Sequence, residues 1–494
     1  MKRKTSADII TFLYAVITAA VVLLICSKSS PLYPLNDWVD ANTFLTIGRG
    51  SLHGKVPYRD LYEQKGPVLY FIHTLAAWIS EDSFLGVWLI EVTAASAFLF
   101  EAALFFRKSC GRYRIWGIPV IAVMVYASQA FCHGDSAEEL CLPLTMWAYM
   151  AGHRAVTGKE SASGREWLML GALAGAVLWI KFTFLGIFAA AIAAMTVTCK
   201  KGMLLRNYAL GIIGAAAVSV PVFLYYALNS ALDDLFSVYF YDNLFRYGSG
   251  DGFSFRHITD GLNFARVFMG AVFWTVCIGI LIMLVRKKYR LAAYFVASLI
   301  IMSLTVFGGH SSYQYYPLAM AVFLPQAADE MISAAEECFH KRGVTLPRRA
   351  YVFCSVFSLL AGTAISFKTS RNVYMLGQSK AELPQYQFAE YIASRGGGSL
   401  LNYGFIDGGF YLAAGQVPEF RYFCLNNMDV PEMKAAQEYY IRSGKADYVV
   451  VRSESPDTEF SFPGYELAVR GELAYYDKYF YYFLFEFNEK SIKS

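Results

Sequence analysis

The sequence predicts an α-helical polytopic membrane protein, with about eleven transmembrane helices and a small extracytoplasmic α/β domain at the C-terminal end. Two observations predict this fold class. Of the 494 residues, 56% are hydrophobic and only 17% are charged, whereas about a quarter of the residues of a soluble protein are charged. The charges also gather in short clusters, and the apolar runs between them approach the ~20 residues that cross a bilayer as a helix.

Flanking Lys and Arg residues orient these runs, because cytoplasmic turns carry an excess of positive charge. The basic Lys2-Arg3-Lys4 places the N terminus in the cytoplasm, and every inner turn that follows is basic, while the turns at 132–139 and 308–314 contain no Lys or Arg. This alternation places the C-terminal domain outside the cell membrane. The predicted spans are residues 9–26, 84–106, 115–131, 140–152, 167–180, 183–199, 208–228, 267–285, 291–307, 315–333 and 350–367.

The remaining composition narrows the classes of function. The net charge of +4 comes from the inner clusters and does not indicate a nucleic-acid partner. The nine cysteines show neither metal-site spacing nor a disulfide framework, so we interpret them as small apolar residues. The first apolar run, Ile9 to Cys26, lacks a clear small-residue cleavage site, which favours a retained span over a signal peptide.

The chain changes character after residue 367, where helix-like and strand-like segments begin to alternate. This order indicates a small α/β domain with a mostly buried sheet. We therefore predict a transmembrane domain at 1–367, with an outer loop at 27–83 (loop 1), and an extracytoplasmic domain at 368–494. The elements expected in the second domain are Leu383–Ser394, Ser399–Phe405, Pro431–Ser443, Tyr448–Arg452 and Tyr479–Phe487.

Loop 1 holds the first group of chemically useful side chains. No inner loop is long enough for a nucleotide-binding domain, so we expect the reactive groups on the outer side. Asp37 and Asp40 follow the first span closely, and Lys65 lies further along the loop. A carboxylate at the membrane surface can act as a general base, and a neighbouring cation can hold an anion. The alternative is that these charges only solvate the loop.

A second acidic group, Glu138 with Glu139 and Asp135, stands at the outer edge of the fourth span. Carboxylates at the edge of hydrocarbon are costly unless they face a polar cavity, which favours a functional role. The alternative is a cap on the helix that follows, since acidic residues suit a helix N-terminus.

Three more residues are candidates for an anion or metal site. Lys181 is the lone cation between two apolar spans, where it either holds a phosphate or extends to the membrane interface. Tyr315 either donates a hydrogen bond to an anion or belongs to an aromatic belt at the membrane boundary. His310 alone does not establish a metal site, and a divalent cation is left open as a cofactor.

These residues carry a family resemblance. Its motifs are Asp40, Phe44, Gly48, Gly54, Pro57-Tyr58-Arg59-Asp60, Lys65-Gly66-Pro67, Glu138–Pro143, Lys181 and Gln314-Tyr315-Tyr316-Pro317. Together they resemble polytopic, lipid-sugar-dependent glycosyltransferases of the C-type fold (glycosyltransferase family 39). This superfamily includes protein O-mannosyltransferases and aminoarabinose transferases, and the chain is most similar to the bacterial branch of rhizobial lipopolysaccharide galacturonosyltransferases. The similarity covers most of the first 330 residues.

The resemblance implies an enzyme that delivers a sugar from a polyprenyl phosphate in the outer leaflet to a glycan, lipid or protein acceptor. It also implies that an acidic residue of the first outer loop is the catalytic base. Asp40 matches that position, with Asp37 second, and Glu138 matches the acidic position of the second outer loop. Gln314 departs from the family's pattern, because relatives often carry His before the two aromatic residues.

We expect Asp40 to deprotonate an acceptor hydroxyl, which then attacks the anomeric carbon in one displacement and inverts it. The polyprenyl phosphate leaves, and its charge is met by Lys65, Lys181, Arg246 or Arg256. The C-terminal domain is expected to position the acceptor.

Two other classes of function are weighed against this one. A transporter or lipid-linked-sugar flippase is expected to place ionisable residues near mid-membrane, often in repeated halves. No repeat is visible, and the mid-span charges are Glu91 and Glu101. A non-catalytic membrane scaffold has no need of the clustered acidic residues.

Overall fold

The computed structural model of the chain describes residues 2–106, 115–158, 161–247, 252–309, 312–340, 348–428, 430–476 and 478–488. The chain forms two compact units, and each is discontinuous in sequence. Unit 1 contains residues 1–27, 90–222 and 251–371, and unit 2 contains residues 28–89, 223–250 and 372–494. The predicted C-terminal domain and the predicted loop 1 therefore fall in the same unit.

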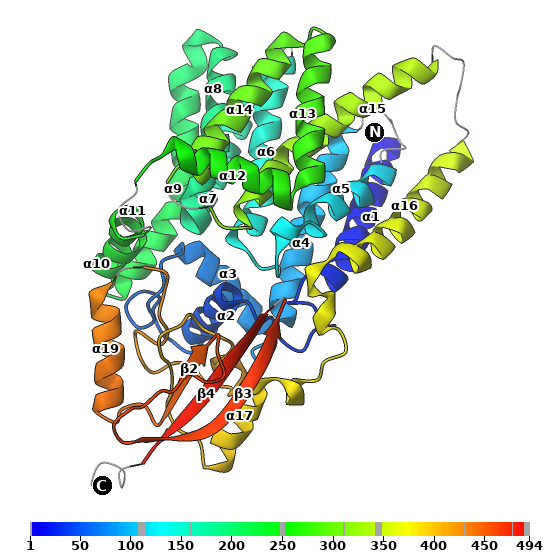
Figure 1. Ribbon diagram of the computed structural model, residues 1–494. Helices are drawn as coiled ribbons and strands as arrows, with labels where there is room; N and C mark the ends of the chain where they lie inside the picture. The colour runs from blue at the N-terminus through cyan, green and yellow to red at the C-terminus, as the bar shows by residue number, and fades with distance from the viewer. Residues whose placement is uncertain are drawn as a thin grey trace. The chain divides into compact units, whose positions relative to one another are not determined.

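Unit 1 is helical throughout its described part (Figure 1). Two of its helices, α4 and α9, continue into residues of unit 2. Its α-helices are α1 Lys2–Cys26, α4 Leu85–Phe105, α5 Gly117–Tyr126, α6 Ala137–Thr157, α7 Gly164–Lys181, α8 Leu185–Val197, α9 Leu204–Leu228, α12 Phe255–Phe268, α13 Gly270–Val285, α14 Tyr289–Phe307, α15 Leu324–His340 and α16 Arg348–Thr369. Its 3-10 segments include η2 Gln129–Phe131, η3 Phe182–Phe184, η4 Lys201–Met203 and η6 Tyr316–Phe323.

Six helical runs of the described chain are long and apolar enough to cross a membrane, or up to seven if the bent pair α12–α13 is one span. Length and composition therefore make this a multi-pass membrane protein. The number is below the eleven predicted spans. Helix α5 has only 10 residues, α6 carries charges at both ends, and the span predicted at 315–333 is divided between η6 and α15.

One of the six runs, Gly164–Val197, reverses direction. The Trp167 ring, at the start of α7, packs on Tyr208 with centroids 5.4 Å apart, and Thr196, at the end of α8, is 2.8 Å from the hydroxyl of the same Tyr208. A straight helix would separate residues 167 and 196 by about 43 Å. Helices α7 and α8 are therefore the hairpin that the sequence predicted, with Lys181 at its tip.

Unit 2 combines short helices with one sheet (Figure 1). Its main helices are α2 Val39–Leu52, α3 Pro67–Ile79, α17 Pro384–Ser394, α18 Phe410–Ala413 and α19 Pro431–Arg442, with 3-10 turns Arg371–Met375 and Lys380–Glu382. Between the predicted spans at 208–228 and 267–285, the described chain is largely helical. It contains α10 Leu232–Asp234, wide π-helical turns at Leu235–Asp242, α11 Asn243–Phe245 and, in unit 1, α12.

The sheet has the strand order β1-β2-β4-β3, from β1 Leu400–Asn402, β2 Tyr448–Ser453, β3 Tyr465–Tyr475 and β4 Lys478–Phe487. Strand β1 pairs parallel to β2, and the other pairs are antiparallel. Val449, Val451, Phe483 and Phe485 form its buried core, together with Ile441 of α19. Helices α17 and α19 and three of the strands were predicted, whereas α18 and the edge strand β3 were missed.

The C-terminal segment of unit 2 holds α2 in place through buried polar contacts. The Thr46 hydroxyl donates to Asp407 over 2.6 Å. Arg49 is only 2% exposed, and its guanidinium donates to the backbone carbonyls of Tyr411 and Gln416. A buried guanidinium is unfavourable unless its N–H groups are satisfied, so α2 depends on residues more than 360 positions later in the chain.

Candidate functional site

Unit 1 brings three predicted site residues together. Lys181, at the tip of the α7–α8 hairpin, forms an ion pair with Glu138 in the first turn of α6. The Lys181 amine lies 4.2 Å from the Tyr316 ring centroid and 5.6 Å from that of Tyr315. Glu138 is 1% exposed, whereas 11% of the Lys181 side chain remains open to solvent. The cation is therefore held by a buried carboxylate and two aromatic faces, with one edge open.

Three further carboxylates, Glu91, Asp135 and Glu139, are buried to 1% exposure or less in unit 1. The Ser27 hydroxyl donates to Glu91 over 2.8 Å, and the Asp135 N–H donates to Glu91 and Glu139 over 2.8 and 3.1 Å. Gly134 adopts φ +88°, and a Cβ there would collide with Ser27 and Glu91. The chain itself therefore supplies hydrogen bonds to Glu91 and Glu139.

The two candidate bases differ in their surroundings in unit 2. Asp37 is buried and lies 2.6 Å from the amine of Lys28, and neither side chain has any exposed surface. The Lys28 amine also donates to the Tyr374 hydroxyl over 2.8 Å and lies about 5 Å from the rings of Tyr374, Tyr475 and Tyr476. Asp40 stands in the first turn of α2 and is half-buried.

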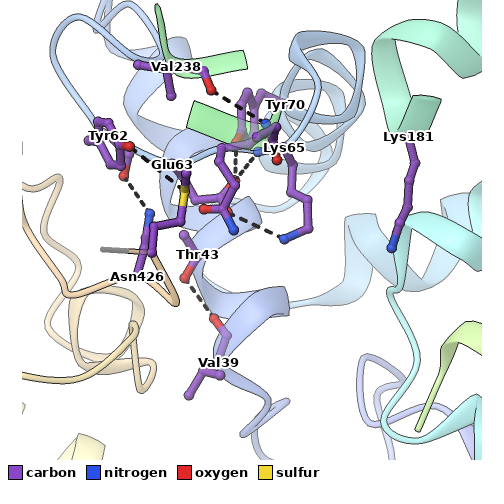
Figure 2. Close-up of polar contacts among 12 residues, drawn as sticks. Val39, Thr43, Tyr62, Glu63, Lys65, Tyr70, Lys181, Val238 and Asn426 are labelled. Carbon is purple, nitrogen blue, oxygen red and sulfur yellow. Dashed lines mark hydrogen bonds and ion pairs between the residues drawn. The ribbon is translucent and has the colours of Figure 1, made fainter. Parts of the chain in front are cut away.

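Lys65 takes part in a second polar group of unit 2, centred on Glu63 (Figure 2). The Glu63 carboxylate, 4% exposed, accepts hydrogen bonds from the Tyr70 hydroxyl and the Lys65 N–H, and the Lys65 amine lies 3.6 Å away. Tyr58 adopts φ +71° and donates to the Lys65 carbonyl over 2.5 Å. These contacts fix the backbone that carries Lys65.

The two predicted arginines have different environments. In unit 2, Arg246 lies 3.4 Å from Asp242, which also accepts a 2.7 Å hydrogen bond from Tyr62. Burial and the Asp242 carboxylate raise the pKa of Tyr62, so its phenol stays a hydrogen-bond donor. In unit 1, Arg256 is 87% exposed on α12, and its guanidinium lies 3.9 Å from Asp260.

Sequence reasoning named Glu138, Lys181 and Tyr315 as separate candidates, which the structure brings together, and it did not single out Lys28 or Glu63. Lys28 is the first cation after the apolar run of α1, which is the one signal that could have drawn attention to it. Glu63 had no distinguishing signal among the charges of loop 1. Gln314, where the family pattern has His, donates to the Gln129 carbonyl over 2.9 Å and accepts from Arg371 at 3.4 Å.

Among the described residues, no group of three or more His, Cys, Asp or Glu side chains is arranged to hold a metal ion. His310 lies outside the described residues. A divalent cation therefore stays a prediction.

The chain is a multi-pass membrane protein with the C-type glycosyltransferase fold and a small C-terminal sheet domain. The chain is similar to the crystal structure of ArnT from Cupriavidus metallidurans bound to undecaprenyl phosphate, with a TM-score of 0.60, 12% identity, and coverage of 95% of this chain and 97% of ArnT. The apo structure of the same ArnT gives a TM-score of 0.60 and 12% identity over 96% of this chain and 97% of ArnT. No protein-family model and no curated protein sequence matches the chain.

Proposed function

We propose that this protein is a membrane glycosyltransferase that transfers a sugar from a polyprenyl phosphate to an extracytoplasmic acceptor, with inversion at the anomeric carbon. The observation that carries the proposal is the fold it shares, over nearly its whole length, with a protein crystallised with undecaprenyl phosphate. The sequence supports it through the alternating basic turns, which place loop 1 and the C-terminal domain outside the cytoplasm. The galacturonosyltransferase-like branch and the acceptor-positioning role of the C-terminal domain stay predictions.

In the proposed reaction, Asp40 accepts the proton of an acceptor hydroxyl as that oxygen forms a bond to the anomeric carbon. The bond between this carbon and the phosphate oxygen breaks, and the polyprenyl phosphate leaves with the electron pair. Asp40 suits the role of base better than Asp37, because Asp37 is enclosed and already neutralised by Lys28. Asp37 has no exposed side-chain surface through which an acceptor hydroxyl reaches it.

Lys181 is the residue we assign to the leaving phosphate. Its open edge lets a second anion approach, and Tyr315 and Tyr316 hold the ammonium by their ring faces. A phosphate that binds there shares the cation with Glu138, so the charge that develops on the leaving group is met by a group already in place. Lys65 and Arg246 are further candidates for donor binding.

The test is turnover by the purified protein with radiolabelled polyprenyl-phosphate sugars. Asp40→Asn keeps the size of the side chain but removes the base, which contributes about 10²–10⁴-fold to such a reaction. We expect a loss in that range with unchanged membrane insertion. Asp457→Asn, an exposed site in the C-terminal segment, is the matched control and should retain activity. Full turnover by a folded Asp40→Asn protein would refute the assignment of the base.

A flippase is the second candidate, and one observation favours it. Glu91 is fully buried within α4, a helix long enough to span the membrane, and intramembrane carboxylates are common in transporters. The same assay separates the two functions. A flippase moves the lipid-linked sugar from one leaflet of the vesicle membrane to the other and leaves the sugar–phosphate bond intact. A transferase breaks that bond and releases free polyprenyl phosphate.

A further inference from the structure

A cavity of about 830 Å³ lies in unit 1, away from every residue given a role above. It is formed by the C-terminal ends of α4 and α6, the turn between α13 and α14, and the first half of α15. Its volume is within the ~300–1,000 Å³ that is usual for pockets that bind small ligands.

The cavity lies where the membrane-crossing segments end. Phe105 is the last residue of α4 and Tyr289 is the first residue of α14, and both residues line the cavity. Both helices are long and apolar enough to cross a bilayer. The cavity is therefore at the level where hydrocarbon meets headgroups, on the side that the basic turns assign to the cytoplasm.

Positive charge dominates the lining, whose charged residues are Arg154, Lys287, Lys288, Arg290, Asp329 and Glu330. Glu330, the more buried acid, is already neutralised. The Lys288 amine lies 2.7 Å from its carboxylate, and the Arg286 guanidinium lies 3.2 Å from it. The negative charge of Glu330 is therefore compensated by Lys288 and Arg286 and does not cancel the positive charges of Arg154, Lys287 and Arg290.

Two of those cations are available to a ligand. No side-chain hydrogen bond or ion pair joins Lys287 or Arg290 to another residue that the structure describes. The first residues of α14, from Tyr289 to Leu291, also line the cavity, and the N–H groups of a first helical turn have no partner within their own helix. Such N–H groups add to the attraction of an anion.

The uncharged part of the lining includes the apolar residues Leu104, Phe105, Met150, Val156 and Leu291, next to polar ones such as Thr157, Gln326 and Ser333. The Phe105 ring packs edge-on against His153 with centroids 5.1 Å apart. An anion-attracting rim next to an apolar wall fits a ligand with a phosphate group attached to a hydrocarbon part, better than it fits a free inorganic anion.

We propose that this cavity binds an anionic phospholipid from the adjoining leaflet. Lys287, Arg290 and the start of α14 take the phosphodiester, and the apolar wall takes the glycerol and the first acyl carbons. The site is separate from the proposed transferase chemistry and does not depend on it. Basic pockets between membrane helices are the usual sites of anionic headgroups.

The experiment is native mass spectrometry of the full chain in detergent, titrated with phosphatidylglycerol or with zwitterionic phosphatidylcholine. Removing two interfacial cations weakens binding of an anionic lipid by about 30-fold. We therefore expect K287Q/R290Q to bind phosphatidylglycerol about 30-fold more weakly than the wild type does. K200Q/K201Q removes two exposed cations from the α8–α9 turn and should retain it. K287R/R290K keeps both positive charges and should also bind phosphatidylglycerol as the wild type does. This variant distinguishes an effect of the lost charges from an effect of misfolding.

Three results would overturn the proposal. If K287Q/R290Q and the wild type bound phosphatidylglycerol equally well, the cavity would not be the binding site of this lipid. Equal binding of phosphatidylcholine by the wild type would remove the role of the negative charge. Displacement of the lipid by millimolar glycerol 3-phosphate would show that the cavity takes a soluble phosphate instead of a lipid.

Discussion

Two lysine–carboxylate pairs, one in each unit, contain the same chemical groups but differ in their access to solvent. Lys28 and Asp37 have no exposed side-chain surface, and three tyrosine rings surround the lysine. In the second pair, Glu138 is buried but Lys181 keeps 11% of its side chain exposed beside two tyrosines. A fully enclosed pair cannot exchange partners without unfolding its surroundings, whereas a pair with an open edge can admit a phosphate. The difference separates a structural ion pair from one that can bind a ligand.

The largest effect is expected where the enclosed pair is broken. Lys28→Met leaves the Asp37 charge buried without its partner, which destabilises a protein by about 3–5 kcal/mol. We expect the variant to lose its folded, monodisperse form in detergent, as measured by size-exclusion chromatography and thermal unfolding. A variant that unfolds at the wild-type temperature would mean that the pair is not enclosed.

The double variant K28M/D37L sharpens this test. Replacement of both members of a buried ion pair by apolar residues is often neutral or stabilising, so we expect folding to recover. We also expect turnover to recover, because Asp40 is the proposed base. A double variant that folds but is inactive would give the catalytic role to Asp37.

Removal of the Lys181–Glu138 pair, which has an open edge, should leave folding intact and lower activity instead. K181M/E138Q removes the cation and neutralises its buried partner together, so no charge is left unpaired and the fold should survive. A hydrogen bond to a charged group contributes about 1.5–3 kcal/mol, so kcat/KM should fall by about 10- to 150-fold. Steady-state kinetics at varied donor concentration measure this change. Unchanged kinetics would exclude Lys181 from donor binding.

The smallest effect is expected at the exposed pair of Arg256 and Asp260, whose side chains are 87% and 56% exposed. Solvent screens such pairs strongly. Arg256→Gln should therefore change neither thermal stability nor kcat/KM by more than about twofold. A larger loss of kcat/KM with intact stability would place Arg256 at the donor after all.

The sequence predicted best the elements that local pattern determines. Helix α3, Pro67–Ile79, coincides with an apolar run of the sequence that begins with a proline. Strand β3 was missed because it is an edge strand with a mostly exposed face, so charged residues such as Glu466 and Arg470 interrupt its apolar pattern. A shift of register between Leu467 and Val469 further disturbs the alternation.

The candidate site was predictable to a smaller extent, for a related reason. Glu138 and Lys181 stand out as charges at the ends of apolar runs, so composition alone identifies them. No local pattern shows that Lys28 and Asp37 are enclosed together, because the burial of this pair depends on Tyr374, which is 346 positions from Lys28. Whether a loop charge is exposed or enclosed is decided by the tertiary fold.

The contacts of α2 have a consequence for the order in which the protein matures. Thr46 and Arg49 emerge from the ribosome early, yet the groups that satisfy them, Asp407 and the carbonyls of Tyr411 and Gln416, are translated near the end. Helix α2 therefore lacks these partners until almost the whole chain has been made. A nascent chain stalled before residue 400 would carry this helix without the contacts that hold it in place.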